Sequence, residues 1–156
     1  MSLHIRTEII GSPDKMQVTL RLGELNPYPV VSVRWILSQC EVPLRFQEYP
    51  TYMVLKVFRS IRAIAMELIS SDAPGDTCES LSSTEFLDGL DVFVKCNKSL
   101  VSLIVDSDER KFTTQLELDA VSRIVNLLDQ EVARFLDVSA KEATDEKGTG
   151  VVSRNA

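Results

Sequence analysis

The chain has 156 residues, 44% hydrophobic and 26% charged, with a formal net charge of −6. This length and composition are typical of one folded domain with a single core. No apolar run reaches the ~20 residues that a membrane-spanning helix needs, and the first residues lack the apolar centre of a signal peptide. Because the three cysteines form no CxxC pair, we expect reduced thiols in a soluble, cytoplasmic protein.

The first half, residues 1–70, reads as strands followed by one helix. Residues 11–15 (GSPDK) are typical of a turn, so the two alternating segments that flank them predict a hairpin. A loop with two prolines follows at 23–29. The predicted strands of this half are Leu3–Ile10, Met16–Leu22, Val30–Leu37 and Leu44–Glu48.

The longest helical pattern is Thr51–Ser70, with Thr51 as its predicted N-cap after Pro50. Its apolar residues at helical spacing predict a core-facing stripe made of Val54, Val57, Phe58, Ile61, Ile64, Ala65, Leu68 and Ile69. Four further residues lie beside the stripe: Leu55, Arg59, Arg62 and Met66. They are either covered by another part of the chain or form a small partner-binding patch rimmed by arginine.

The second half, residues 85–138, follows a polar linker at 71–84. It contains three predicted strands, Leu90–Cys96, Leu100–Asp106 and Lys111–Leu118. A second helix, Asp119–Leu136, begins with Asp119 as its predicted N-cap and leaves only Leu127 outside its apolar stripe. Residues 139–156 are polar and contain glycine, which predicts a disordered tail.

The two halves repeat one another. At an offset of 67 residues the apolar positions of the first helix fall on those of the second, for example Val54 on Val121 and Ile61 on Leu128, except that Ile64 falls on Glu131. Strand-like segments precede each helix. We therefore predict an α+β fold, a mostly antiparallel sheet covered by two amphipathic helices, built from two β-β-β-α halves that pack as one domain.

Charge is distributed unequally between the halves. Residues 1–70 have a balance of +2, whereas residues 71–156 have a balance of −8. An acidic surface is unsuited to wrapping a phosphate backbone, but it suits a basic protein partner. The densest carboxylates are candidate partner-binding residues: Asp88, Asp91, Asp106, Asp108 and Glu109. They could instead be a solvated hairpin turn that keeps the protein soluble.

Most catalytic and cofactor motifs are absent from the sequence. His4 is the only histidine, which removes most histidine-based catalysis and zinc binding. There is no glycine-rich phosphate loop, and the carboxylates lack the spacing of a calcium loop. We expect no cofactor, no metal and no catalytic residue.

Arginine and aromatic residues gather in the first half. Such residues occur at protein-binding hot spots and on surfaces that stack single-stranded nucleic acid. Trp35 is expected in the core, and adjacent strand residues point to opposite faces, which weakens the group as one surface. Its members are Arg21, Arg34, Trp35, Arg45, Phe46, Tyr49 and Tyr52.

The layout of residues 6–70 resembles small bacterial domains of unknown function found among toxin-immunity and defence-associated genes. It consists of RTEIIGSPDKMQVTLRLGELNPYP, then VSVRW, a strand with phenylalanine and an amphipathic helix. The resemblance implies a non-catalytic interaction protein of the immunity or inhibitor type, with a protein partner. The sequence leaves open whether the two halves pair within one chain or between two chains of a homodimer. Two alternatives stay open: a nucleic-acid accessory factor using the first half, and a small enzyme with carboxylate chemistry.

Overall fold

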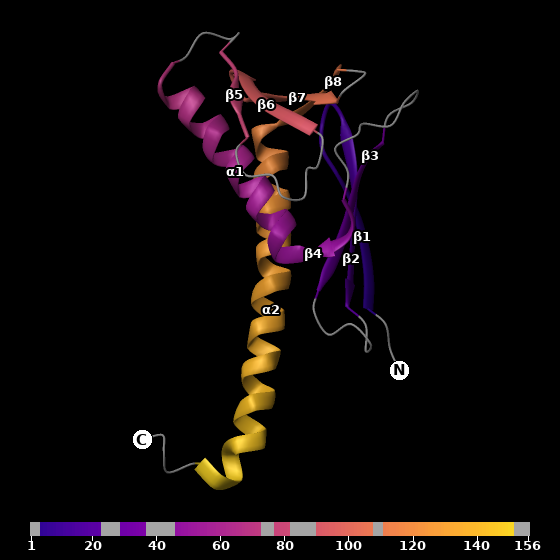
Figure 1. The fold of residues 1–156 in the computed structure, drawn as a ribbon, viewed down its shortest axis with the longest axis vertical. Coiled ribbons are helices and arrows are strands. Elements are labelled where there is room, and N and C mark those ends of the chain that lie inside the picture. The colour runs from indigo at the N-terminus through magenta and orange to yellow at the C-terminus, as the bar shows by residue number, and fades with distance from the viewer. Residues whose placement is uncertain are drawn as a thin grey trace.

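A computed structural model describes residues 4–22, 29–36, 46–72, 77–81, 90–107 and 111–151. Within these residues the chain forms two four-stranded antiparallel sheets and two helices, which confirms the α+β class (Figure 1). The elements are β1 His4–Ile10, β2 Lys15–Leu22, β3 Val30–Ile36, β4 Phe46–Pro50, α1 Thr51–Ser70, β5 Glu79–Ser80, β6 Leu90–Asn97, β7 Leu100–Ser107, β8 Lys111–Glu117 and α2 Leu118–Val151.

The first sheet is a meander in the order β1-β2-β3-β4. Its strands alternate as predicted, with Met16, Val18 and Leu20 of β2 buried and the residues between them half-buried or exposed. The register between β3 and β4 shifts between Val31 and Val33, where the chain turns toward α1. The sheet therefore has one apolar face toward the core and one face toward solvent.

The second sheet is a separate meander in the order β5-β6-β7-β8. Its first strand, β5, lies in the segment expected to be only a linker, because Glu79 and Ser80 pair with Val94 and Phe93 of β6. Two exposed residues carry no periodicity that could predict a strand, so pairing with β6 decides this one. The expectation of one shared sheet is therefore wrong, because the described strands form two.

The two helices pack against each other, with the first sheet beside α2 and the second sheet across their upper ends (Figure 1). Helix α1 contacts β3 and β4 of its own half and also β6 of the other, while α2 contacts β8 and also β1. Contact with several elements buries a wider arc than contact with a single sheet. For this reason Leu55 and Leu127, which lie outside the predicted stripes, are buried at 3% and 6% exposure. The prediction that Ile69 belongs to the buried stripe is wrong, because Ile69 is 41% exposed.

Each helix begins where a backbone carbonyl accepts a hydrogen bond from its first residue. Thr51 N–H donates to the Pro29 carbonyl at 3.0 Å, and Leu118 N–H donates to the Ser99 carbonyl at 2.8 Å. Pro50 is the N-cap of α1 with no side-chain capping bond, so the prediction of Thr51 as the cap is wrong. Asp119 lies inside the first turn of α2 rather than at its cap, where its charge favours the helix dipole.

Helix α2 continues well beyond the predicted end at Leu136 and runs past the sheets to Val151 (Figure 1). The predicted disordered tail is therefore helical over residues 139–151, while residues 152–156 lie outside the described part. Near its start the segment contains four good helix formers, Ala140, Lys141, Glu142 and Ala143, within an otherwise polar composition. Neither described helix combines the length and apolarity required to cross a bilayer.

The turn between β1 and β2 joins the two halves. Pro13 bridges to Leu116 of β8, Asp14 N–H donates to the Gln115 carbonyl at 3.1 Å, and Glu117 N–H donates to the Ser12 carbonyl at 2.8 Å. The carboxylate of Asp14 also accepts bonds from Thr114 Oγ1 at 2.9 Å and from Gln115 N–H at 2.8 Å. The turn between β1 and β2 thus supplies hydrogen-bond partners for backbone groups on the outer edge of β8, the edge strand of the second sheet.

Candidate functional site

Both sheets pack their apolar faces against the helices. On each strand every second side chain points to the opposite face, and these side chains form the solvent face of the sheet. On the second sheet the register places these side chains in cross-strand rows. One row is Asp91, Asp106 and Lys111, and the next is Phe93, Ile104 and Thr113. The solvent face of the second sheet thus has an acidic row beside an apolar one.

Asp91 and Asp106 are direct partners in the β6–β7 register. Asp91 is exposed and Asp106 is half-buried, and among the described residues neither forms an ion pair within 4.0 Å. Like charges directly opposite one another on a sheet are destabilising. The register thus places two carboxylates opposite one another, with Lys111 opposite Asp106 on its other side, and a bound cation could offset the repulsion of the carboxylates.

Phe93 and Ile104 lie next to this acidic pair and are half-buried. The sequence did not single them out, because each lies in a run of three consecutive apolar residues, 92–94 and 103–105, in which periodicity does not distinguish the two faces. The register identifies them, because Phe93 points to the same face of the sheet as Asp91, whereas Val92 and Val94 point into the core. The solvent face of the second sheet therefore presents an aromatic and an aliphatic side chain beside two carboxylates.

The acidic candidates of the sequence are thus placed only in part. The structure brings Asp91 and Asp106 together, while Asp88, Asp108 and Glu109 lie outside the described residues. Within the described part, no three histidine, cysteine, aspartate or glutamate side chains cluster closely enough to hold a metal ion.

The second candidate patch, on α1, does not form one surface. Leu55 belongs to the core at 3% exposure, so its side chain is not accessible to a partner. Arg59 Nη2 donates to Asp129 Oδ1 of α2 at 2.7 Å and thereby links the two helices. Arg62 is half-buried, and Met66 is 54% exposed. Among the four candidates, Met66 is the apolar side chain that remains available to a partner.

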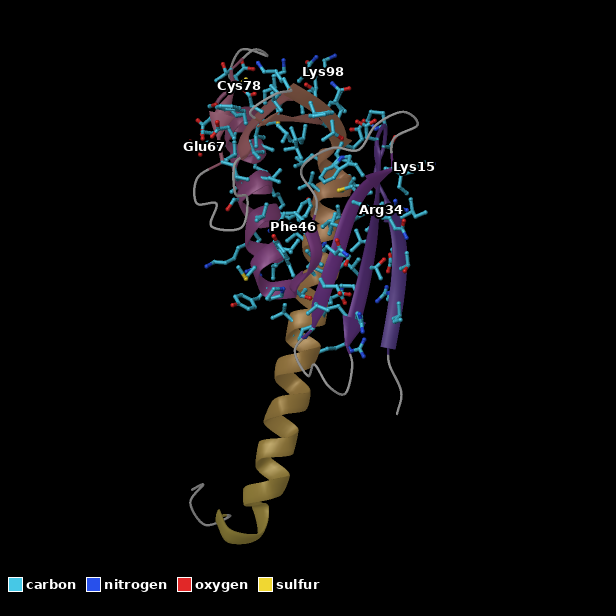
Figure 2. The ribbon with its side chains drawn as sticks, turned by 45° about the vertical axis from the view of Figure 1, so that its right-hand side comes forward. Lys15, Arg34, Phe46, Glu67, Cys78 and Lys98 are labelled. Atoms are coloured by element: carbon cyan, nitrogen blue, oxygen red, sulfur yellow. The ribbon has the colours of Figure 1, made fainter. Side chains whose placement is uncertain are left out.

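The arginine and aromatic group of the first half is also divided. Trp35 and Phe46 are buried at 4% and 2% exposure, with the Phe46 ring 6.4 Å from that of Phe58. Figure 2 shows Phe46 between α1 and the sheet, while Arg34 and Lys15 lie on the solvent side. Arg45 lies outside the described residues, and Tyr52 is 58% exposed on α1. The cations and the aromatic rings therefore do not share one stacking surface.

The solvent face of the first sheet is polar, and side chains of neighbouring strands satisfy its arginines. Arg34 donates from Nε and Nη2 to Gln17 Oε1 at 3.0 and 2.8 Å. Arg21 forms an ion pair with Glu48, whose N–H donates to Ser32 Oγ at 2.9 Å. Three isoleucines interrupt this polar face, and sequence alone assigned them no role: Ile5, Ile9 and Ile36.

The described cysteines differ in environment. Cys96 is buried beneath α1, and its Sγ lies 3.7 Å from the Ala65 carbonyl oxygen, to which the thiol donates. Burial raises the pKa of the Cys96 thiol, which keeps it protonated and a poor nucleophile at neutral pH. Cys78 is exposed.

Comparison with known proteins adds no relative to this picture. A scan against protein-family models finds no match, and a search of curated proteins finds no similar sequence.

Proposed function

We propose that the protein is a non-catalytic interaction protein, of the immunity or inhibitor type, that binds a basic protein through the solvent face of its second sheet. The observation that carries this proposal is the acidic row, in which Asp91 and Asp106 face each other without an ion-pair partner among the described residues. The docking residues are Asp91, Asp106, Phe93 and Ile104.

Electrostatics gives the first argument for a basic partner. A lysine or arginine placed between Asp91 and Asp106 would interact with both carboxylates and remove their mutual repulsion. Charge-assisted bonds of this kind contribute more than neutral ones, and complementary potentials raise the association rate. Because the excess acid of the chain lies in residues 71–156, the wider field has the same sign.

Apolar contact gives the second argument. Phe93 and Ile104 lie in the row next to the carboxylates, so a partner can insert an apolar side chain while its cation reaches the acidic row. Binding energy in interfaces is concentrated in such small apolar centres with a polar rim. This arrangement favours a folded protein partner over a small charged metabolite.

The experiment is affinity capture from a lysate of the native host with the immobilised protein and two variants. In the first variant Asp91→Lys is combined with Asp106→Lys. The control combines Glu67→Gln with Asp72→Asn, two exposed acidic positions at the end of α1, away from the second sheet's solvent face. We expect a basic protein to be retained by the native chain and by the control but lost with the first variant.

Two results would contradict the proposal. One is capture of the same protein by all three chains, which would place the contact elsewhere. The other is failure of the native chain to capture any protein while the purified protein turns over a small molecule. Circular dichroism of the variants separates loss of binding from loss of folding.

A second candidate function, binding of single-stranded nucleic acid, draws on the solvent face of the first sheet. Three cations occur there, Lys15, Arg21 and Arg34, against one carboxylate of Glu48. This role predicts salt-sensitive binding of a fluorescent oligonucleotide that Arg34→Glu weakens. No retention at ~0.1 M salt would end it.

A further inference from the structure

Strand β1 is the first edge strand of the first sheet. It lies at the margin of the first sheet, and no described strand pairs with its outer edge (Figures 1 and 2). Proteins commonly block such edges with proline, charged side chains, a bulge, or a covering helix or loop. In β1 the seven-residue register with β2 is unbroken, there is no proline, and its two charges, Arg6 and Glu8, pair with each other.

The outer edge also carries exposed apolar side chains. Ile5 and Ile9 project from the solvent face of the first sheet at 59% and 57% exposure, on either side of Thr7. Ile36 on β3 is the third exposed isoleucine of this face, at 40%. Two isoleucines on an open edge strand indicate that a further strand docks there.

The sequence of β1 is complementary to itself in the antiparallel direction. A two-fold axis through Thr7 places Ile5 opposite Ile9 of a second copy, and Arg6 opposite Glu8. Residues directly opposite in an antiparallel pair share a face, so the isoleucines meet on the solvent face and the charges meet on the other. Both contacts occur twice because the interface is two-fold symmetric.

We propose that β1 pairs with β1 of a second copy of this chain, centred on Thr7, so that two first sheets join into one continuous antiparallel sheet. The register is specific: a slip by one residue would place Ile5 and Ile9 against side chains of the other face. Because the paired area is small, the dimer is weak and depends on concentration. This proposal does not depend on the acidic row or on the identity of any partner.

Charge reversal at the two ion-pair positions tests the register. Arg6→Glu gives a chain with two acidic positions on β1, and Glu8→Arg gives a chain with two basic ones. Alone, each chain places like charges opposite one another in the dimer, and we expect dimer affinity to fall about tenfold or more. When the two variants are mixed, opposite charges meet again, so the dimer returns as a heterodimer. Sedimentation equilibrium over about 5 μM to 1 mM, chosen for a weak interface, measures this.

An apolar variant provides a second test with a matched control. Ile5→Lys combined with Ile9→Lys should leave the fold unchanged, since both side chains are largely exposed, and should give a monomer throughout the same range. Ile36→Lys changes an exposed isoleucine of the same face away from the edge and should leave the dimer intact. A native chain that stays monomeric, or a dimer that persists in both charge-reversed chains alone, would overturn the proposal.

Discussion

The two halves of the molecule share a core design and differ on their solvent faces. Each half is a four-stranded antiparallel meander followed by a helix that begins at the last strand. On the first sheet, Arg21 and Arg34 are satisfied by Glu48 and Gln17, whereas on the second sheet Asp91 and Asp106 face each other. The repeat therefore maintains the fold, and the differences between the halves indicate where function has diverged.

The core also shows that the halves are not independent units. Helix α1 of the first half packs on β6 of the second, α2 of the second half reaches β1, and the β1–β2 turn pairs with β8. Neither sheet can bury its apolar face without a helix of the other half. We therefore expect a single cooperative unfolding transition, and the predictions below probe this sharing before they probe the solvent faces.

The largest effect is expected from Leu55→Ala in α1. Leu55 is 3% exposed because α1 is covered on more than one side, so truncation should lower the free energy of unfolding by about 2–5 kcal/mol. Met66→Ala on the same helix is the control, and because Met66 is 54% exposed its cost should stay within about 0.5 kcal/mol. Urea denaturation of both variants gives the comparison, and equal losses would mean that α1 is covered on one side only.

Gly11→Ala should have the next largest effect, because Gly11 shapes the turn that joins the halves. Its φ is 128°, and an added Cβ would overlap the Asp14 carbonyl oxygen and lie 2.8 Å from Leu116 Cδ2 of the other half. We expect a loss of about 2–3 kcal/mol. Ser12→Ala is the matched control, since only the backbone of Ser12 bonds to β8. An equal loss of stability in this variant would mean that any side-chain change in the turn has this effect, and that the conformation of Gly11 is not the cause.

The contact between the β1–β2 turn and β8 is the part of the fold that could not be predicted from the sequence. The turn at residues 11–15 is predictable from glycine, proline and aspartate, and so are its flanking strands and both helices, because those signals are local. What Asp14 binds is 100 residues away in the chain, at Thr114, and no periodicity encodes that distance. The division into two sheets escaped prediction for the same reason, since strand pairing across the chain is a tertiary choice.

The candidate site shows the same limit. The sequence places Asp91 and Asp106 in a dense carboxylate group, but that they are direct cross-strand partners depends on the β6–β7 register. For Leu55 the sequence leaves open a covered position or a surface patch, because a helical wheel assumes one buried side, whereas α1 contacts several elements. The isoleucines of β1 gave no signal, because alternation alone does not tell an edge strand from a central one.

Asp14→Ala should cost less than the glycine change while acting on the same joint. The Asp14 carboxylate accepts bonds from Thr114 Oγ1 and Gln115 N–H, and Thr114 is fully buried. Removing the acceptor leaves these donors without that partner, which we expect to cost about 1–3 kcal/mol. Adding Thr114→Val should recover part of the loss, since it removes the stranded hydroxyl. Thermal denaturation of the single and double variants measures this, and strictly additive losses would contradict the coupling.

The smallest effect, and the one that bears most directly on function, is expected from Asp91→Asn. It removes one of two facing carboxylates and leaves Asp106 beside Lys111, so it should stabilise the fold by roughly 0.2–1 kcal/mol. The gain should shrink as salt is added, because ions screen exposed charges over about 10 Å at 0.1 M. Chemical denaturation at low and high salt measures it, with Glu67→Gln on α1 as the control that should change little.

The sign of that change decides how the acidic row should be understood. A gain in stability would show that the chain maintains a repulsion it could lose through a single substitution, as expected where stability is given up for binding. A loss of stability would instead show that the Asp91 carboxylate is already neutralised within the chain. In that case a bound cation would gain little from the acidic row. The electrostatic argument for a basic partner would then fail, even if Phe93 and Ile104 still formed an apolar contact.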